Sequence, residues 1–539
     1  MLMSVIRRAP AARAWRATCR SARALAVCAL LSLVAACATH PSATTLERTV
    51  SHALPADAAT PLRDALAAPV AARPGESGFR LLADGAAALQ MRIALARAAT
   101  RTLDMQYYIA TEDTTGKLLL GAALYAADRG VRVRMLVDDL NFRDIDRVMA
   151  ALNTHPNIEI RVFNPFGASQ RDVMQRTANF FTRIDRFTRR MHNKAMIADN
   201  QIAIVGGRNL GDEYFSASPT LQFRDLDVLA AGPVTHDISA SFDAYWASGS
   251  SYPLRVLNHQ TFDPKELDAM RDELRAHWRE NAEPYNAKPL NATPLAQQIA
   301  RGELGLVWAP AEFEADAPDK VAQPTDGYVS PPMRRLAELI RAAQHEFLAF
   351  SPYFVPHDAG VKILGDTTAR GVRVAILTNS LAATDAVAVQ AGYGPYRVPL
   401  LRHGVELYEY KARPGRPRLL GSRSRASLHA KAYVIDREIL VIGSMNLDPR
   451  STHLNTELAL VIHSPALAQQ VATIFARATQ PDESYRVQLA ALSGPGASEL
   501  TWIGTDEGVL RTYHVDPYAG LLRNVLTGVF MLLPVDDQL

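Results

Sequence analysis

The chain has 539 residues, of which 48% are hydrophobic and 21% charged, and its formal net charge is +3 at pH 7. That composition excludes a disordered or fibrous protein, and the length is enough for two to four globular domains. Residues 1–36 contain six arginines and no acidic residue, so the chain without them has a charge of −3 and gives no reason to expect a nucleic-acid partner.

The first 36 residues have the pattern of an export signal peptide. Arginines are followed by an apolar run, Ala24–Ala36, which at 13 residues is too short to cross a bilayer. The run ends in Leu33-Val34-Ala35-Ala36-Cys37, which resembles a bacterial lipobox with a lipidated cysteine; the alternative is a plain secretory signal cleaved near Ala36. With Ala38 next, the resemblance implies a lipoprotein that faces the periplasm, on the outer rather than the inner membrane.

Cysteine usage agrees with export. The three cysteines are Cys19, Cys28 and Cys37, and the first two belong to the signal. The mature body then forms no internal disulfide and no cysteine metal site. Residues 37–75 are rich in Ala, Pro, Thr and Ser, so we expect a lipidated flexible tether that could contain a short helix, with ordered structure beginning near Phe79.

The body of the chain begins with alternating helices and strands. Apolar spacing predicts a helix over Ala86–Thr100, a strand through 103–109, a helix over Gly116–Arg129, and strands over 131–137 and Ile158–Phe163. This first unit is assigned to residues 76–255. Residues 256–305 are a linker that contains a helix, Pro264–Asn281.

The second unit, residues 306–484, repeats that order. A helix over Met333–Gln344 and a strand over Glu346–Pro352 are followed by Arg370-Gly371-Val372-Arg373-Val374, which repeats residues 129–133 letter for letter, and by a strand over Val405–Tyr410. The repeat predicts an α/β fold with two tandem domains, each a largely parallel sheet flanked by helices. The two domains are expected to form a pseudo-two-fold dimer with one active site at the interface, and the chain to be a monomer.

The last segment, residues 485–539, is a C-terminal extension with Trp502, Tyr513 and an apolar run, Leu521–Leu533. The run predicts a helix packed on the body, with a membrane-surface helix as the alternative. Before the first motif described below, a basic and aromatic run would hold anionic headgroups or a nucleic-acid backbone, or else is a solvated face. It contains Arg176, Phe180, Phe181, Arg183, Arg186, Phe187, Arg189 and Arg190.

Each unit ends in the same motif. From the histidine, Lys lies at +2, Asp at +7, Gly at +14 and Asn at +17 in both copies. The first copy is His192, Lys194, Asp199, Gly206 and Asn209; the second is His429, Lys431, Asp436, Gly443 and Asn446. One HxK pair alone would be most simply explained as a surface strand, but two copies with matched offsets indicate a shared function.

The motif predicts a hairpin that gathers polar groups at one end. His and Lys two residues apart project from the same face of a strand. The apolar segments 195–198 and 202–205 flank a turn at Asp199-Asn200, and the small residues Gly207 and Ser444 allow close approach on the return. Two lysines and two asparagines then supply donors for phosphate oxygens, and two histidines can divide the nucleophile and general-acid roles.

These motifs, HxKxxxxD followed by GGxN or GSxN, resemble those of the phospholipase D superfamily over residues 80–480. The stretches 189–194, 206–215, 443–451 and 454–457 are most similar to bacterial cardiolipin synthases, the cardiolipin synthase C branch in particular. The resemblance implies a phosphohistidine mechanism without metal or cofactor. By analogy with that family His192 is the nucleophile and His429 the acid, but the symmetry of the two motifs leaves the reverse assignment open. Lys194, Lys431, Asn209 and Asn446 would hold the phosphate.

The acidic residues have two expected roles. Asp199 and Asp436 have the opposite parity to His and Lys, so they are expected to fix the turn rather than to do chemistry. A catalytic histidine also needs an acceptor on its other ring nitrogen, which the resembling family supplies from a downstream acid. The candidates are Asp225, 33 residues after His192, and Glu457, 28 residues after His429.

Four functions are consistent with parts of this pattern. The first is a phosphatidyltransferase that makes cardiolipin from phosphatidylglycerol and a second phospholipid, for example phosphatidylethanolamine. The second, with the same residues, is a phospholipase D that uses water as acceptor. A nuclease is disfavoured by the membrane anchor and the acidic mature charge, and a catalytically silent scaffold by the two intact motifs.

Overall fold

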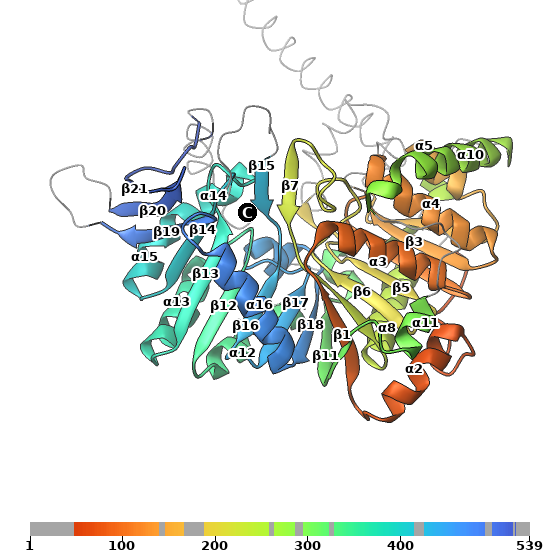
Figure 1. Ribbon diagram of the computed structural model, residues 1–539, viewed down its shortest axis with the longest axis horizontal. Coiled ribbons are helices and arrows are strands. Elements are labelled where there is room, and N and C mark those ends of the chain that lie inside the picture. Colours follow the sequence, from red (N-terminus) through yellow and green to blue (C-terminus); the bar gives the residue numbers. More distant parts are fainter. Residues whose placement is uncertain are drawn as a thin grey trace, which may run out of the picture.

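The computed structural model describes residues 48–139, 146–165, 188–257, 264–285, 295–322, 328–413, 425–490, 499–520 and 523. Two α/β domains lie side by side, each built on one large sheet (Figure 1). Cys37 and the export signal lie outside the described residues, as does the run Leu521–Leu533 apart from Arg523. None of the described helices has both the length and the hydropathy that a membrane span requires.

The first sheet has nine strands in the order β10-β1-β8-β6-β5-β2-β3-β4-β9. Only β2–β3 and β3–β4 pair in parallel, and every other pair is antiparallel. The strands are β1 (Ser77–Leu82), β2 (Thr102–Tyr107), β3 (Arg132–Asp138), β4 (Ile158–Phe163), β5 (Ala195–Ala198), β6 (Ile202–Gly206), β8 (Asp227–Ala231), β9 (Ser251–Pro253) and β10 (Val307–Ala309).

The second sheet has ten strands in the order β11-β18-β17-β16-β12-β13-β14-β19-β20-β21, again with two parallel pairs, β12–β13 and β13–β14. Its strands are β11 (Ala311–Ala315), β12 (Glu346–Phe350), β13 (Arg373–Asn379), β14 (Glu406–Tyr410), β16 (Ala432–Ile435), β17 (Ile439–Gly443), β18 (Leu458–His463), β19 (Ser484–Leu489), β20 (Leu500–Asp506) and β21 (Val509–Tyr513). A third, two-stranded sheet joins β7 (Leu221–Arg224) of the first domain to β15 (Arg425–Leu428) of the second.

The expectation of largely parallel sheets was therefore wrong, although the α/β fold and the duplication are present. Helical crossovers connect β2 to β3 to β4 in the first domain and β12 to β13 to β14 in the second, and these strands pair in parallel. The motif that follows is a hairpin, and a hairpin pairs its strands antiparallel. Because each hairpin inserts next to β2 or β12, the antiparallel pairs outnumber the parallel ones.

The helices of the first domain and linker are α2 (Pro61–Ala71), α3 (Gly85–Ala98), α4 (Thr114–Asp128), α5 (Asp146–Leu152), α8 (Val234–Ala247), α9 (Leu254–Leu257), α10 (Pro264–Asn281) and α11 (Leu295–Ala300). In the second domain they are α12 (Pro331–Ala342), α13 (His357–Ala369), α14 (Val387–Tyr393), α15 (Arg397–Arg402) and α16 (Pro465–Ala478). The helices predicted over residues 86–100, 116–129, 264–281 and 333–344 match α3, α4, α10 and α12 of the structure to within two residues. The Asp84 and Asp113 side chains cap α3 and α4 by accepting from backbone N–H groups.

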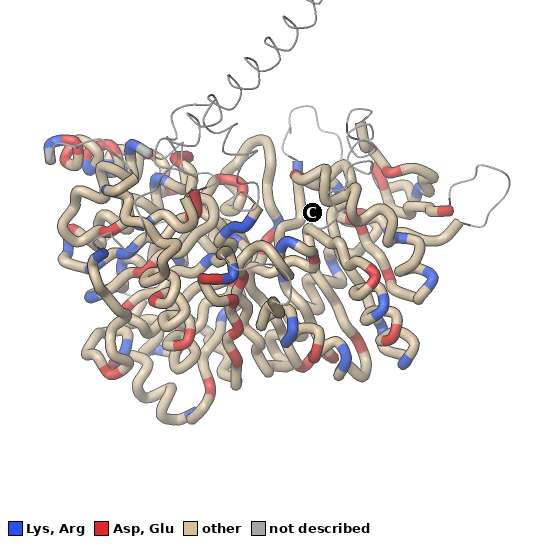
Figure 2. The backbone as a smooth tube through the Cα atoms, turned by 180° about the vertical axis from the view of Figure 1, so that it is seen from behind, with Lys and Arg blue, Asp and Glu red and all other residues tan. Residues whose placement is uncertain are grey.

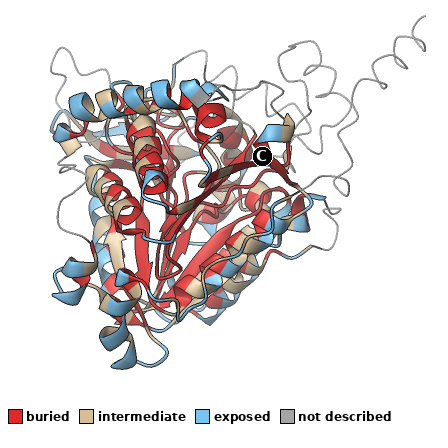
Figure 3. Cartoon of the chain, turned by 90° about the vertical axis from the view of Figure 1, so that its right-hand side faces the viewer, coloured by how far each residue is buried: buried red, intermediate tan, exposed pale blue. Residues whose placement is uncertain are grey.

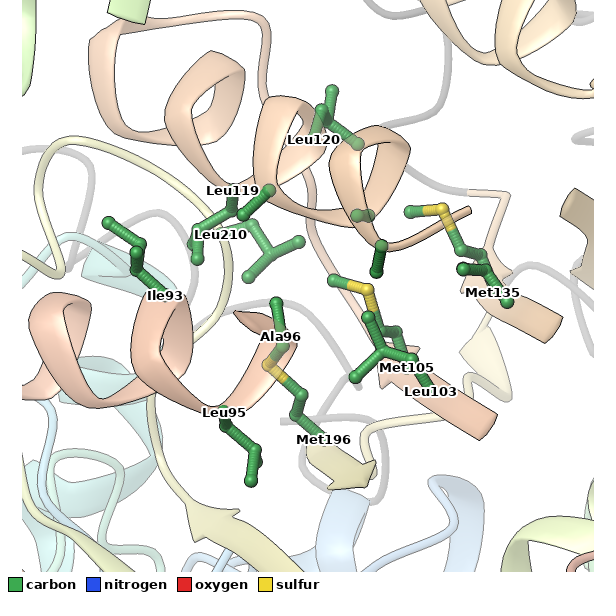
Figure 4. Packing of buried hydrophobic residues seen from close by; sticks show 14 of the residues in the cluster. Ile93, Leu95, Ala96, Leu103, Met105, Leu119, Leu120, Met135, Met196 and Leu210 are labelled. Carbon is green, nitrogen blue, oxygen red and sulfur yellow. The ribbon is translucent and has the colours of Figure 1, made fainter. Parts of the chain in front are cut away.

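Three apolar cores hold the molecule together. Between α3, α4 and the first sheet, Ile93, Leu95, Leu119, Met105 and Met135 are packed closely (Figure 4). A second core is shared, because it joins residues of the first sheet to residues of the second sheet across the interface; it includes Ile197, Val205, Val228, Val434, Ile442 and Leu460. The sheets are accordingly the most buried layer, with exposed helix faces outside them (Figure 3). The interface is thus part of the folded core and holds the two domains in a fixed arrangement.

The domain boundaries differ from the expected ones at three places. Part of the expected tether is ordered, because Leu62 and Leu66 of α2 are buried in the first core and Arg48 donates to the Ser251 carbonyl. The linker helix α10 packs along α4, and β10, expected in the second domain, joins the first sheet. The extension after residue 484 is not separate, because β19, β20 and β21 continue the second sheet.

Charged residues of both signs are interspersed over the described parts of both domains (Figure 2). Several of the buried ones form ion pairs. Asp227 accepts from Arg92 and Arg208 in the first domain, and Glu409 pairs with Arg397 in the second. These ion pairs lie within the domains and fix loop ends rather than forming a surface patch.

Candidate active site

Both motifs form the predicted hairpins. β5 pairs with β6 and β16 with β17, and the central residues of each turn have positive φ: Asp199 and Asn200 in the first, Asp436 and Arg437 in the second. Turns of this kind match the twist of the flanking strands, and Asp and Asn tolerate the left-handed region better than most residues. Each histidine and lysine therefore stands at the open end of a short hairpin, opposite the turn.

The motif aspartates hold the turn to the neighbouring strand. Asp199 accepts from the backbone N–H groups of Thr100, Arg101 and Thr102 at 2.8–3.2 Å and from the Thr100 hydroxyl. Asp436 accepts in the same way from residues 344, 345 and 346. They anchor the start of β2 and β12, which agrees with the expected structural role.

The backbone segments that carry the two histidines each hydrogen-bond to the backbone of the other domain. His192 N–H donates to the Thr456 carbonyl, and Thr456 N–H donates to the Arg190 carbonyl. In the pseudo-symmetric place, β15 pairs in parallel with β7, and His429 N–H donates to the Arg224 carbonyl. Figure 1 shows β7 and β15 side by side where the two domains meet. The segment before each histidine thus pairs with the segment before the other domain's acid.

As a result, each motif histidine is hydrogen-bonded to an acid that belongs to the other domain. His192 Nδ1 lies 2.9 Å from Glu457 Oε2, and His429 Nδ1 lies 2.6 Å from Asp225 Oδ2. The sequence had offered each acid as the partner of the histidine it follows, and that pairing is wrong. Asp225, of the first domain, orients the histidine of the second, and Glu457, of the second, orients that of the first.

The two acids have different surroundings. Glu457 accepts from the hydroxyls of Ser444 and Ser451, and burial raises its pKa against the opposing effect of Lys194. Burial also favours the neutral form of Asp225, but His429, Lys431 and Arg208 outweigh it and lower the pKa of Asp225. Asp225 is therefore the more firmly ionised acid of the two.

The small residue two positions before each asparagine lies against an acid. A Cβ on Gly207 would overlap the Asp225 carboxylate. At the matching position, Ser444 carries a side chain and uses it to donate to Glu457. Position 207 must therefore be glycine to leave room for the Asp225 carboxylate. At the matching position of the second motif, the Ser444 hydroxyl contacts Glu457 instead.

Both motif lysines are buried beside the histidines. Lys194 Nζ donates to the His192 carbonyl and Lys431 Nζ to the His429 carbonyl, each at 2.6 Å. Burial and the neighbouring Lys431 hold the pKa of Lys194 well below its usual range, and burial lowers the pKa of Lys431 to about 8. Two buried lysine side chains next to each other make a site that favours an anion, since an anion stabilises their charged forms.

The two imidazoles also differ in how readily they take up a proton. Burial, Lys194 and Lys431 hold the pKa of His192 well below its usual range. Burial and Lys431 also lower the pKa of His429, but Asp225 opposes them. His192 is thus the more firmly neutral imidazole, and His429 the more readily protonated one.

The asparagines complete the site. Asn209 accepts from Ile109 N–H and donates to the Tyr214 hydroxyl, whereas buried Asn446 Oδ1 has no hydrogen-bond partner among the described residues. A buried polar atom without a partner costs about 1–3 kcal/mol, which a bound ligand can recover. The Asn446 Oδ1 atom is therefore available to accept a hydrogen bond from a donor group of a substrate.

Several site residues were missed or left undecided by the sequence. Tyr214 and Phe223 contact the His429 ring, with centroid separations of 5.3 and 4.8 Å. Tyr108 contacts the His192 ring, with a centroid separation of 5.1 Å. Aromatic residues are common in cores, so only their nearness to the motifs along the chain could have indicated them. Arg190, of the basic run, is buried against Asp138, and residues 166–187 lie outside the described part.

Within the described residues no group of three or more His, Cys, Asp or Glu side chains could hold a metal ion. The site is instead a cluster of two acid-bound histidines, two lysines and two asparagines drawn from both domains. Such a cluster can bind a phosphoryl group, accept it covalently on one imidazole, and move a proton with the other.

Comparisons with known proteins agree with this chemistry. The family model described as "Cardiolipin synthase, PLD-like domain" matches residues 92–246 and again residues 336–479. The cardiolipin synthase C of Escherichia coli (strain K12) is 38% identical over 470 residues, which cover 86% of this chain and 96% of that protein. The cardiolipin synthase A of Pseudomonas entomophila (strain L48) is 29% identical over 396 residues, 73% of this chain and 66% of that protein.

Among solved structures, the phosphatidylserine synthase of Haemophilus influenzae Rd KW20 is similar with a TM-score of 0.52 and 15% sequence identity, covering 76% of this chain and 87% of that one. At that identity the similarity shows the fold alone. The matched ranges of the family model contain both motifs and both exchanged acids.

Proposed function

The chain belongs to the cardiolipin synthase family of phospholipase D-like enzymes, and from this premise we propose that it is a phospholipid phosphatidyltransferase that makes cardiolipin through a phosphohistidine. The observation that carries the proposal is the pair of buried histidines, each held at Nδ1 by an acid of the other domain, between two buried lysines. This arrangement leaves both Nε2 atoms for the reaction and provides positive charge for a phosphodiester.

The transfer takes two displacements at phosphorus. In the first, His192 Nε2 bonds to phosphorus while the bond from phosphorus to the headgroup oxygen breaks, and His429 gives its proton to the departing alkoxide. In the second, His429 takes the proton of the incoming alcohol, whose oxygen bonds to phosphorus as the phosphorus–nitrogen bond breaks. The same histidine serves both steps, as acid and then as base.

The assignment of roles follows from the charges around each ring. A nucleophile must be unprotonated, and the lowered pKa of His192 keeps its imidazole neutral. A general acid must hold a proton, and ionised Asp225 favours the protonated form of His429. Lys194, Lys431, Asn209 and Asn446 hold the phosphate oxygens, where the negative charge grows in each displacement.

The lipid products test the proposed function. Purified enzyme is incubated with phosphatidylglycerol, alone and with phosphatidylethanolamine, and the products are resolved by mass spectrometry. Cardiolipin that is absent with His192→Ala supports the synthase. Phosphatidic acid without cardiolipin would make the protein a phospholipase D, and no lipid turnover at all would favour a nuclease or another phosphodiesterase.

The roles of the histidines need a separate test. With a phosphatidyl donor whose leaving group is p-nitrophenolate, no general acid is needed. His429→Ala should then release p-nitrophenol and accumulate a phosphatidylated protein, while release of glycerol from phosphatidylglycerol falls by about 100- to 10,000-fold. His192→Ala should form no covalent species with either donor. A covalent species in His192→Ala and none in His429→Ala would reverse the assignment.

We also propose that the enzyme is a monomeric lipoprotein, anchored through Cys37 on the periplasmic face of the outer membrane. The support is the sequence around Cys37, the position of Ala38 and the presence of both motifs in one chain. Metabolic labelling with radioactive palmitate, followed by membrane fractionation, tests the anchor. Label that persists in Cys37→Ala, or an unlabelled wild type, would contradict it.

A further inference from the structure

An exposed carboxylate lies beside the second motif and is not used by the mechanism above. Asp385, in the loop between β13 and α14, accepts a hydrogen bond from the Tyr353 hydroxyl at 2.7 Å. The Tyr353 ring in turn lies 5.9 Å from Lys431 Nζ. Within the described part of the chain, the second Asp385 oxygen has no hydrogen-bond partner, and the carboxylate forms no salt bridge, although the Arg523 guanidinium bound to the same loop interacts with it electrostatically.

The loop around Asp385 is held firmly. Buried Thr384 exchanges hydrogen bonds with Ala386 on the far side of Asp385, at 3.1 and 3.2 Å. The Arg523 guanidinium donates to the carbonyls of Leu381 and Thr384 at 2.7 and 2.8 Å. Ser380 N–H, at the start of the loop, donates to the Tyr410 carbonyl of β14. The carboxylate is therefore presented in a defined place and does not sample the surface freely.

The charge of Asp385 acts on the second half of the site. Burial lowers the pKa of both His429 and Lys431, and the Asp385 carboxylate opposes this by favouring the protonated form of each. A negative charge this close to a phosphodiester site repels the phosphate of the substrate. That repulsion weakens substrate binding unless the carboxylate contacts another part of the substrate.

The part of the substrate on this side is the headgroup alcohol. In the proposed mechanism His429 protonates the alcohol that leaves and deprotonates the alcohol that enters, so both occupy the space beside His429. In a phospholipid headgroup, hydroxyl and ammonium groups are the ones that can donate a hydrogen bond to a carboxylate. Tyr353 holds one Asp385 oxygen and leaves the other for such a donor.

We propose that Asp385, oriented by Tyr353, forms a headgroup subsite that binds a hydroxyl or ammonium group on the leaving and entering alcohol. This proposal rests on the proposed function and adds to it the class of alcohol that the site selects. Alcohols with a second donor group, such as glycerol or ethanolamine units, are favoured over plain alkanols. A hydroxyl and an ammonium group can both donate to the carboxylate, and the experiment below distinguishes between the two.

The test measures transfer of a fluorescent phosphatidyl group to three soluble acceptors in competition: 1-propanol, 1,2-propanediol and ethanolamine. Wild type should prefer the diol and ethanolamine to 1-propanol. Asp385→Asn, which keeps an acceptor oxygen but loses the charge, should lower the preference for ethanolamine on the order of tenfold and keep most of the preference for the diol. Asp385→Ala should lose both preferences, so that the diol and ethanolamine no longer compete better than 1-propanol does.

Two further variants complete the test. Tyr353→Phe removes the hydroxyl that orients the carboxylate, and it should reduce both preferences by less than Asp385→Ala does. Asp366→Asn changes an exposed aspartate of α13 whose partner is Lys362, and it should match wild type with all acceptors. A uniform fall with every acceptor in Asp385→Ala, or unchanged preferences, would overturn the subsite. A wild type that transfers to no alcohol would instead overturn the proposed phosphatidyltransferase, and the subsite with it.

Discussion

At the scale of single residues, the buried lysines determine how the site responds to pH. Burial lowers the pKa of Lys431 to about 8, and an anion bound next to it would raise that pKa again. Below pH 8 Lys431 is already protonated in the free enzyme, so an anion binds without the uptake of a proton by Lys431. Above pH 8 the free lysine is neutral, and binding must take up a proton. Affinity for a phosphate mimic should therefore fall as pH rises through about 8.

This is measurable by calorimetry with tungstate, whose charge does not change in the range. The dissociation constant should rise between pH 7.5 and 9, by at most about tenfold per pH unit for one titrating group. Lys431→Arg, which stays charged, should make the rise shallower. An affinity that is flat over this range in wild type would contradict the lowered pKa.

The difference between Gly207 and Ser444 gives a second prediction at this scale. Gly207→Ala places a Cβ against the Asp225 carboxylate, which must move away from His429. We expect kcat to fall at least on the order of tenfold, because His429 loses its orientation. Ser444→Ala creates no overlap and removes one hydrogen bond to Glu457, at a cost of about 1 kcal/mol of stability. Steady-state kinetics and thermal melts compare the two, and full activity in Gly207→Ala would contradict the positioning role of Asp225.

At the scale of elements, each hairpin has a catalytic end and a structural end. Asp199 anchors the turn by accepting from three backbone N–H groups, and about seven residues of extended chain, roughly 20 Å, separate it from His192. Asp199→Ala leaves those groups without a partner and should lower the free energy of unfolding by about 3 kcal/mol. The folded fraction should keep its kcat. Urea denaturation and activity at 25 °C test this, and a stable but inactive variant would give Asp199 a chemical role.

The hairpins could be predicted because all their information is local. A doubled HxK spacing, apolar four-residue runs and Asp at the turn specify two strands and their faces. The sheet composition could not be predicted in the same way. The crossovers favour parallel strands, whereas the insertion of a hairpin beside β2 or β12 depends on contacts between distant segments. The same limit explains why β10, in the expected second domain, joined the first sheet.

At the scale of the whole molecule, the interface is what completes the site. Sequence spacing identified His192, His429, Asp225 and Glu457, but it paired each acid with the nearer histidine. The exchange follows from β7–β15 and from the bridge between Met191 and Thr456, which are pairings across about 200 residues or more. No periodicity within one repeat encodes them. The shared core of the two sheets makes the exchange permanent, so neither domain holds a complete histidine–acid pair.

The exchange predicts that a substitution in one domain changes the histidine of the other. Asp225→Asn removes the charge that favours the protonated form of His429, so the pKa of His429 falls further. Because a general acid works only while protonated, the descending limb of the pH–rate profile for glycerol release should move to lower pH, and the rate at pH 7 should fall. With a p-nitrophenolate leaving group, which needs no acid, Asp225→Asn should be close to wild type.

Glu457→Gln is the matched control, because it removes the acceptor of the nucleophile. His192 attacks phosphorus whatever the leaving group, so Glu457→Gln should slow release of glycerol and of p-nitrophenol alike. Since Asp225 belongs to the first domain and Glu457 to the second, this result places each acid's effect on the opposite motif. If Asp225→Asn slowed both leaving groups equally while Glu457→Gln slowed glycerol alone, each acid would serve its own domain's histidine or the roles of the two histidines would be reversed. The covalent species in His429→Ala and His192→Ala separates these two explanations.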